Sequence, residues 1–243
     1  MSFKKTLISI LATATLCFAG CSSQLYQEDI PKNYKENPQI WSQLEKEKPT
    51  SLTGIRKFLF EKILFITEKK ENWSSARKTL ERGYGECDDI AIAGSYLAES
   101  LGYPPKMLFL VDPFKGGHSS TLLEKKTKDG VKYGCIDQTE IFYPTYDSIE
   151  SLVNDINRSY EIIGEEAMKK YKIKKMNYGY YLVLDLDSLD KEWRTTDKNL
   201  ALPQNEISLN LVQVPQSKNR KKNIEGYRIS PSIIFNLPKE NEK

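Results

Sequence analysis

The chain has 243 residues, of which 39% are hydrophobic, 11% aromatic and 28% charged. This much hydrophobic sequence can bury a core, which excludes a wholly disordered or collagen-like chain. Histidine occurs once, as His118, which excludes a zinc site built on several histidines and any mechanism that needs two imidazoles.

The first twenty residues have the pattern of a signal peptide. Lys4 and Lys5 precede an apolar run, Leu7 to Phe18, that is too short to span a bilayer as a mature helix. Ala-Gly-Cys follows, and the segment resembles the lipobox of bacterial lipoproteins, in which Cys21 would be lipidated and become the first residue. We therefore predict a signal peptide over residues 1–20 and export to the bacterial cell envelope, with membrane anchoring through lipidated Cys21. A secretory signal without a lipid is the alternative.

Loss of the signal peptide leaves 34 Lys and Arg against 33 Asp and Glu, because Lys4 and Lys5 are its only charged residues. This balance predicts no nucleic-acid partner, since such partners select a strongly basic surface. Residues 21–50 combine prolines with many charges and are predicted to be a tether that lifts the domain off the membrane. Residues 51–243 are then one folded domain with a C-terminal extension.

Helices are the first elements predicted after the tether. Apolar residues recur at helical spacing from Leu52 to Ile66, and a second helix is expected over residues 74–82. A third helix begins at Cys87 and stops at Gly102, before two prolines. Small residues on its apolar face would let a sheet pack closely against it, at positions 91, 94 and 98.

Strands and one further helix follow. The expected strands are 106–111, 118–126, 131–137, 178–186, 206–214 and 226–237, with a helix at 148–160. The tripeptide Lys128-Asp129-Gly130 is predicted to be a hairpin turn. Because helices come first and antiparallel strands follow, the predicted fold class is α+β.

Cys87 lies at the start of its helix, where a cysteine is a candidate nucleophile. The first-turn N–H groups have no partners within a helix and the helix dipole is positive there, which favours a thiolate. The backbone N–H of Cys87 can also stabilise the oxyanion that forms when the sulfur attacks a carbonyl. The negative charges of Asp88 and Asp89 oppose the stabilisation of a thiolate. Their position in the first turn favours a role in stabilising the start of the helix.

His118 and Asp137 complete a candidate triad. A hairpin that turns at Asp129-Gly130 pairs positions summing to about 259, so His118 lies level with residue 141, a few positions from Asp137. His118 would take the thiol proton and later protonate the leaving amine, while Asp137 would orient the ring.

The residues around Cys87 resemble the core of the transglutaminase-like superfamily, and are most similar to its exported bacterial cysteine proteinases. That core reads Gly-x-Cys-x-Asp-x-Ala and then Leu-Gly-hydrophobic-Pro. This chain has Gly85-Glu86-Cys87-Asp88-Asp89-Ile90-Ala91 and Leu101-Gly102-Tyr103-Pro104. The family's His and Asp follow on neighbouring strands, as His118 and Asp137 do in the predicted elements. The resemblance covers roughly residues 58–145.

The resemblance implies a papain-like core, in which the helix of the nucleophile packs on an antiparallel sheet. It implies a cysteine hydrolase that cleaves a peptide or isopeptide bond in a protein or cell-wall peptide, through a thioester and with no required cofactor. Members of the proteinase group bind calcium through acids beside the cysteine, so Asp88 and Asp89 are candidate calcium ligands. Trp73, upstream of the helix, is a candidate for the oxyanion site or the substrate wall, with a plain core aromatic as the alternative.

Two alternatives compete with this function. An exported protein can form disulfides, and a Cys87–Cys135 disulfide would abolish the nucleophile. The domain could also be a non-catalytic member of the same fold that serves as a binding or scaffold module at the envelope. The intact set of Cys, His and Asp favours the enzyme.

Overall fold

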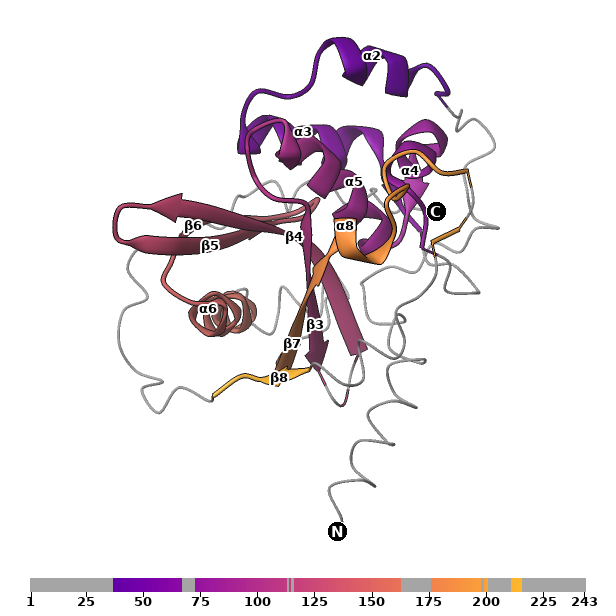
Figure 1. Ribbon diagram of the computed structural model, residues 1–243. Coiled ribbons are helices and arrows are strands. Elements are labelled where there is room, and N and C mark those ends of the chain that lie inside the picture. Colours follow the sequence, from indigo (N-terminus) through magenta and orange to yellow (C-terminus); the bar gives the residue numbers. More distant parts are fainter. Residues whose placement is uncertain are drawn as a thin grey trace.

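The structure of the chain is a computed structural model that describes residues 37–66, 73–112, 114, 116–162, 176–197, 199–200 and 211–215 (Figure 1). The predicted signal peptide, Cys21 and the strand expected at 226–237 lie outside these residues. Within the described ranges, no helix combines the length and the apolar character needed to cross a bilayer.

The described elements form a helix-rich block followed by a strand-rich block. In chain order they are α2 (Ile40–Lys46), α3 (Leu52–Lys62), β1 (Leu64–Phe65), α4 (Ala76–Arg82), β2 (Tyr84–Gly85), α5 (Cys87–Glu99), β3 (Lys106–Asp112), β4 (Gly116–Thr127), β5 (Gly130–Ile136), β6 (Ile141–Tyr146), α6 (Ile149–Ile162), β7 (Tyr180–Asp185), α8 (Leu186–Leu189) and β8 (Val212–Gln213).

Six strands form one sheet in the order β6-β5-β4-β3-β7-β8, and every neighbouring pair is antiparallel. The short strands β1 and β2 form a separate parallel pair. The fold class is therefore α+β, as the sequence predicts. Helix α5 packs on the antiparallel sheet, which is consistent with the papain-like arrangement that the resemblance implies.

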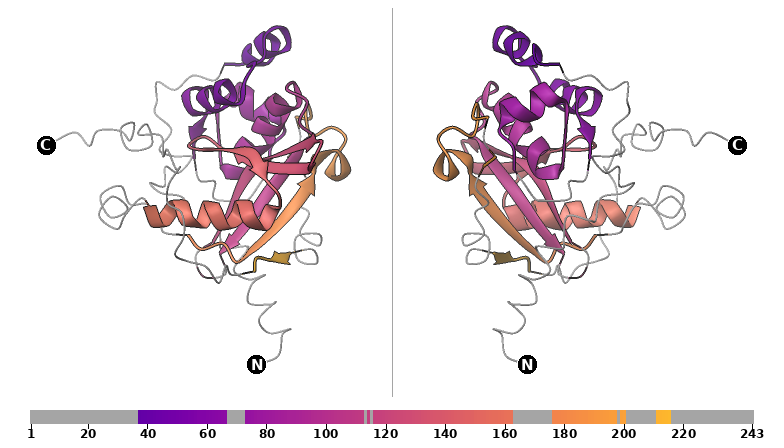
Figure 2. Two further views of the ribbon diagram at one scale, coloured as in Figure 1. Left: turned by 90° about the vertical axis from the view of Figure 1, so that its left-hand side faces the viewer. Right: turned by 90° about the vertical axis from the view of Figure 1, so that its right-hand side faces the viewer.

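The large sheet separates two hydrophobic cores. Side chains of a strand alternate between the two faces, and in β3 Met107, Phe109 and Val111 enter the first core while Leu108 and Leu110 enter the second. Helices α2 to α5 contribute to the first core and α6 to the second, and Figures 1 and 2 place α6 on the opposite side of the sheet from α3 and α5. This division leaves α5 between the sheet and the other helices.

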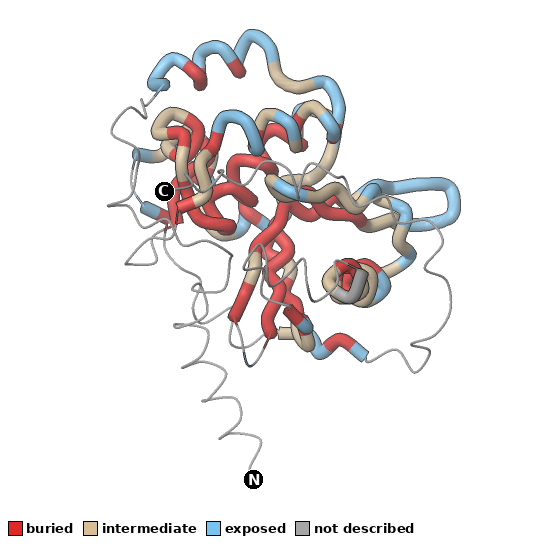
Figure 3. Tube along the Cα trace, turned by 180° about the vertical axis from the view of Figure 1, so that it is seen from behind, coloured by how far each residue is buried: buried red, intermediate tan, exposed pale blue. Residues whose placement is uncertain are grey.

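Helix α5 is buried along nearly its whole length, from Cys87 to Ala98 (Figure 3). Close packing on β4 depends on Gly94, because a Cβ at that position would lie 2.2 Å from Oγ1 of Thr121. The same hydroxyl donates a hydrogen bond to the carbonyl of Ala91 at 2.9 Å. The prediction of a thin helix face for close packing on a sheet is therefore confirmed.

The predicted boundary between tether and domain needs correction. Residues 21–36 lie outside the described part, but α2 places Ile40, Trp41 and Leu44 in the first core. The ring of Trp41 stacks on Tyr96 of α5, with 4.5 Å between the ring centroids. The folded domain therefore begins before residue 51, because an aromatic contact with α5 draws this polar segment onto it.

Three other elements differ from the sequence prediction. The helix expected to reach Ile66 ends at Lys62, and the N–H of Leu64 instead donates to the carbonyl of Gly83, at 2.7 Å, where β1 meets β2. Strand β6 was not predicted, because it contains Pro144 and its side chains are only half-buried or exposed. Proline is tolerated in such an edge strand. The short helix α8 was also not predicted.

Candidate active site

The turn between α4 and α5 places Cys87 at the first position of α5. Gly83 ends α4 in the left-handed region, with φ of 70°, and the chain then passes through β2 to Glu86, the N-cap of α5. Gly85 is needed for close approach, because a Cβ there would lie 2.6 Å from the Cβ of Asp89. The Cys87 side chain is consequently held at the helix N-terminus, where it is 6% exposed.

Asp89 anchors the start of α5. Its carboxylate accepts hydrogen bonds from the N–H of Ser74 at 2.7 Å and from the N–H of Glu86 at 3.4 Å, and it forms an ion pair with the guanidinium of Arg82. Burial raises the pKa of Asp89, and these donors oppose the rise without cancelling it. The contacts give Asp89 the role in helix stabilisation that its position favours.

Asp88 is also buried, at 2% exposure, and its Oδ1 has no hydrogen-bond partner among the described residues. Burial raises the pKa of Asp88 well above its ordinary value, and the charges of Asp89 and Cys87 add to the rise. Asp88 therefore lies beside the thiol as a carboxyl group that is costly to ionise.

The surroundings of Asp88 and Asp89 do not fit a calcium site built on these two residues. Calcium takes six to eight oxygen ligands, whereas the carboxylate of Asp89 is occupied by a cation, Arg82, and by backbone N–H groups. No group of three or more His, Cys, Asp or Glu suited to a metal ion occurs in the part of the chain that the structure describes. Calcium binding stays a prediction.

His118 and Asp137 are hydrogen-bonded to each other. Nε2 of His118 lies 3.1 Å from Oδ2 of Asp137, and the two side chains are 19% and 21% exposed. The other oxygen, Oδ1, accepts from the N–H of Thr139 at 2.7 Å, from its hydroxyl at 2.8 Å and from the N–H of Glu140 at 2.8 Å. The turn over residues 137–140 therefore holds one carboxylate oxygen and directs the other to the ring.

Cys87 also interacts with His118. Burial lowers the pKa of His118, but hydrogen bonds with Asp137 and with Cys87, and the charges of both, raise it to about 10. Burial raises the pKa of Asp137, and the bond to His118 together with those from Glu140 and Thr139 brings it below its ordinary value. These shifts favour the charged ring of His118 and the ionised carboxylate of Asp137 at neutral pH.

The register of β4 and β5 explains why His118 reaches Asp137. Paired positions such as Thr121 and Ile136 sum to 257, two less than the predicted 259, because residues 128 and 129 alone form the turn. On this register His118 lies level with Thr139 rather than with residue 141. The correction brings Asp137 closer to the ring than predicted, and His118 and Asp137 are hydrogen-bonded.

The remaining candidates have the following positions. Trp73 is 1% exposed in the first core, and its Nε1 has no hydrogen-bond partner among the described residues. An oxyanion or substrate-wall role for Trp73 stays a prediction.

Cys87 and Cys135 form no disulfide, and Cys135 belongs to the second core, where it is the cross-strand partner of Leu122. The rival disulfide is therefore absent from the structure.

Three residues that the sequence does not single out contribute to the surroundings of this site. Arg82 pairs with Asp89, Gln138 contacts α3, and Glu140 closes the turn of Asp137. Burial and the charge of Asp137 raise the pKa of Glu140 to about 7, although His118 opposes the rise. Only Gln138 and Glu140 had a sequence signal, since both lie within three residues of Asp137.

A thiol at a helix N-terminus, hydrogen-bonded to an imidazole that a carboxylate orients, can supply a thiolate nucleophile and a general acid. The backbone N–H groups of the first helical turn can stabilise an oxyanion beside the sulfur. The arrangement is therefore suited to acyl transfer.

Comparisons with known proteins give a distant likeness among solved structures. No protein-family model matches the chain, and no curated protein matches it. Among solved structures, LapG of Legionella pneumophila is similar to this chain at 12% sequence identity, over 60% of this chain and 75% of that one, with a TM-score of 0.36. At this TM-score neither a family nor an activity is inferred from the likeness.

Proposed function

We propose that the chain is a membrane-anchored cysteine hydrolase of the transglutaminase-like type, which cleaves a peptide or isopeptide bond in a protein or cell-wall peptide. The observation that carries the proposal is the hydrogen bond between His118 and Asp137, together with the place of Cys87 at the start of α5, where it interacts with the same ring. The residue pattern around Cys87 supports the same reaction class.

The first half of the reaction forms a thioester. The sulfur of Cys87 attacks the carbonyl carbon of the amide, and the thiol proton resides on His118, whose pKa of about 10 favours the charged ring. The oxyanion that forms is stabilised by N–H groups of the first turn of α5. The C–N bond then breaks, His118 gives its proton to the departing nitrogen, and the free amine leaves.

The second half of the reaction releases the acid. His118, now neutral, takes a proton from water, and the resulting hydroxide attacks the thioester carbonyl. The C–S bond breaks, the carboxylic acid departs, and the proton returns to the Cys87–His118 pair. Asp137 keeps its negative charge throughout and holds the ring through Nε2, which leaves Nδ1 for the proton transfers.

Membrane anchoring through Cys21 belongs to the same proposal. It is supported by the basic, apolar and Ala-Gly-Cys sequence of the N-terminus. An anchored enzyme would act on bonds near the membrane surface. Mass measurement of the detergent-extracted mature chain tests this part, since lipidation adds the mass of the acyl chains to a protein that begins at Cys21.

Cys87→Ala tests the catalytic part, with Cys135→Ala as the matched control. Both substitutions remove a buried thiol that forms no disulfide, but Cys135 lies in the second core. Envelope extracts are incubated with each variant, and new amino termini and released amines are identified by mass spectrometry. We expect products from wild type and Cys135→Ala, and a rate at least about 1,000-fold lower with Cys87→Ala.

Equal product patterns from wild type and Cys87→Ala would leave only a binding or scaffold role. Alkylation provides an independent readout. Iodoacetamide added without prior reduction should label Cys87 in the Cys135→Ala variant, and should do so faster than it labels Cys135 in the Cys87→Ala variant. Equal slow labelling of both thiols would contradict an activated Cys87.

A further inference from the structure

The side chain of Gln138 joins the turn of Asp137 to helix α3. Its Nε2 donates to the carbonyl of Leu59 at 3.1 Å and also to the carbonyl of Ile63. These carbonyls belong to the last turn and the C-cap of α3, and that of Leu59 also accepts from the N–H of Ile63 at 3.1 Å. An amide with two N–H donors suits this place.

A second contact from α3 reaches the same turn. Nη1 of Arg56 donates to the carbonyl of Thr139 at 3.3 Å, in an exposed position. The Gln138 contact is better shielded, because Leu59 and Ile63 are 0% and 3% exposed. Gln138 is therefore the more deeply placed of the two links between α3 and the turn.

The hydrogen bonds that Asp137 accepts lie within the turn, whereas those that Gln138 donates connect the turn to α3. Thr139 and Glu140 donate to Asp137 from within the turn, so these bonds move with it. Strand pairing fixes only the base of the turn, at Ile136 and Ile141. Gln138 instead bonds to residues 75 and 79 positions away in the sequence. Its contact relates the turn to the helical side of the molecule.

We infer that Gln138 is a positioning residue: by fixing the turn on α3, it holds Oδ2 of Asp137 against the imidazole of His118. The inference rests on the proposed function in so far as it concerns catalysis. It also concerns the geometry of the His118–Asp137 pair, which can be measured whether or not a substrate is known. Gln138 touches none of the reacting atoms, and it acts through Asp137.

The test compares Gln138→Met with Asn157→Leu in the purified chain. Each change replaces a side-chain amide with an apolar group of similar size. Asn157 is a matched control because its amide also binds backbone groups, at the carbonyl and the N–H of Tyr178, at 3.0 and 2.7 Å. It lies on α6, outside the residues that form the candidate site.

The first readout is the pKa of His118 by NMR. His118 is the only histidine, so a chain with labelled histidine and no histidine tag gives one ring signal that needs no assignment. A nearby carboxylate favours the charged ring, and loosening it lowers the pKa. We expect a pKa near 10 in wild type and in Asn157→Leu, and a value at least about one unit lower in Gln138→Met.

The second readout is hydrolysis of a substrate identified with the wild-type chain. Misplaced catalytic groups lower the rate of the chemical step, so we expect kcat for Gln138→Met to fall about 10- to 100-fold with KM nearly unchanged. Asn157→Leu should keep its kcat.

Each other outcome overturns the inference. An unchanged His118 pKa in Gln138→Met would show that the turn keeps its place without the amide. Equal losses of kcat in Gln138→Met and Asn157→Leu, without a pKa difference between them, would show a general structural role. Should wild type cleave nothing, the proposed function fails, and the His118 pKa alone still decides the positioning role.

Discussion

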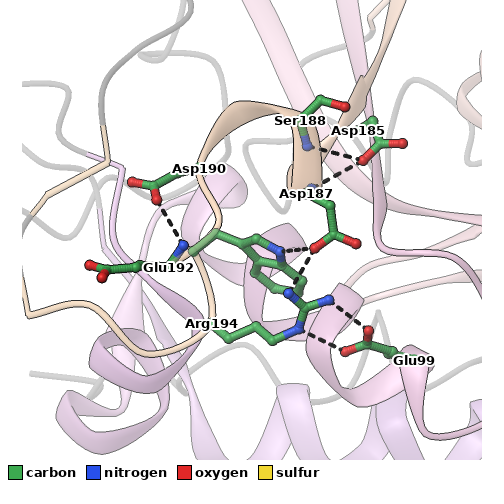
Figure 4. A network of polar contacts seen from close by, with 8 residues as sticks. Glu99, Asp185, Asp187, Ser188, Asp190, Glu192 and Arg194 are labelled. Atoms are coloured by element: carbon green, nitrogen blue, oxygen red, sulfur yellow. Dashed lines mark hydrogen bonds and ion pairs between the residues drawn. The ribbon is translucent and has the colours of Figure 1, made fainter.

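Charged side chains fix both ends of helix α5, but the two ends differ in solvent exposure. At the N-terminal end the side chains of Asp89 and Arg82 are 1% and 12% exposed. At the C-terminal end Arg194 binds Glu99 through two hydrogen bonds, of 3.0 and 2.7 Å, and Asp187 through one of 2.7 Å (Figure 4). These three side chains are 28% to 52% exposed.

The difference in exposure determines how strongly each charged pair affects stability. A buried pair has lost its water, so each partner depends strongly on the other. An exposed pair is screened and contributes little. The pair of Arg194 with Glu99 joins the segment after β7 to α5, and Trp193, which is 0% exposed, belongs to the first core. The candidate active site lies at the buried end, where position matters most.

The largest expected effect is that of Arg82→Met. Removal of the guanidinium leaves Asp89 buried without a cation, which should lower the free energy of unfolding by about 3–5 kcal/mol. Urea denaturation measures the loss. The double variant with Asp89→Asn should recover part of it, because no uncompensated charge remains. A loss below about 1 kcal/mol would mean that the Arg82–Asp89 pair contributes no more to stability than an exposed pair does. The contrast between the two ends of α5 would then be removed.

Gly94→Ala probes the middle of α5 and should have an intermediate effect. The added methyl group would lie 2.2 Å from Oγ1 of Thr121, and overpacking of this kind costs about 1–3 kcal/mol. The cost should exceed the gain of about 1 kcal/mol that alanine brings to a helix interior. Thermal unfolding of Gly94→Ala, Thr121→Ala and the double variant checks this, since relief of the clash makes the two changes non-additive. Additive losses would contradict the clash.

Arg194→Ala should have a smaller effect, about 1 kcal/mol or less. Its ion pairs are partly solvated, so 1 M KCl should reduce the stability difference from wild type. The same salt should leave the effect of Arg82→Met nearly unchanged, because that pair is buried. A loss at Arg194 as large as that at Arg82 would erase the difference between the two ends.

Glu140→Gln should change the pH dependence of stability rather than its level at low pH. Burial and Asp137 raise the pKa of Glu140 from 4.5 to about 7, with His118 opposing. The folded state then holds this proton more tightly than the unfolded chain, so the contribution of Glu140 is present below pH 4.5 and is lost as the pH rises through about 7. As the pH rises from 4.5 to about 7, wild type should lose stability relative to Glu140→Gln. The difference in melting temperature, variant minus wild type, should therefore increase over this range and stay constant above it. A constant difference at all pH values would contradict the raised pKa.

Local features of the sequence predict α5 and the place of Cys87. A tight glycine turn, an apolar face and two prolines act within a few residues of one another, and the structure has the helix from Cys87 to Glu99. The approach of His118 to Asp137 can be predicted only approximately. The sequence does not reveal how many residues form the β4–β5 turn, and that number sets which residues pair.

Contacts between distant segments cannot be predicted in this way. The segment around Trp41 has the composition of a tether, yet its ring packs on Tyr96, 55 positions later. Likewise, nothing beside Gln138 in the sequence points to the carbonyls of Leu59 and Ile63. Tertiary contacts of this kind override local preferences.

The two-residue turn at positions 128 and 129 has a consequence for how this protein can vary. Both residues are exposed, and surface loops of this kind commonly tolerate insertions. Here the length of the turn sets the register of β4 and β5. A slip of one residue in β5 would reverse which side chains reach each core and would move Asp137 away from the ring. Natural relatives should therefore change the identity of these two residues freely while conserving their number.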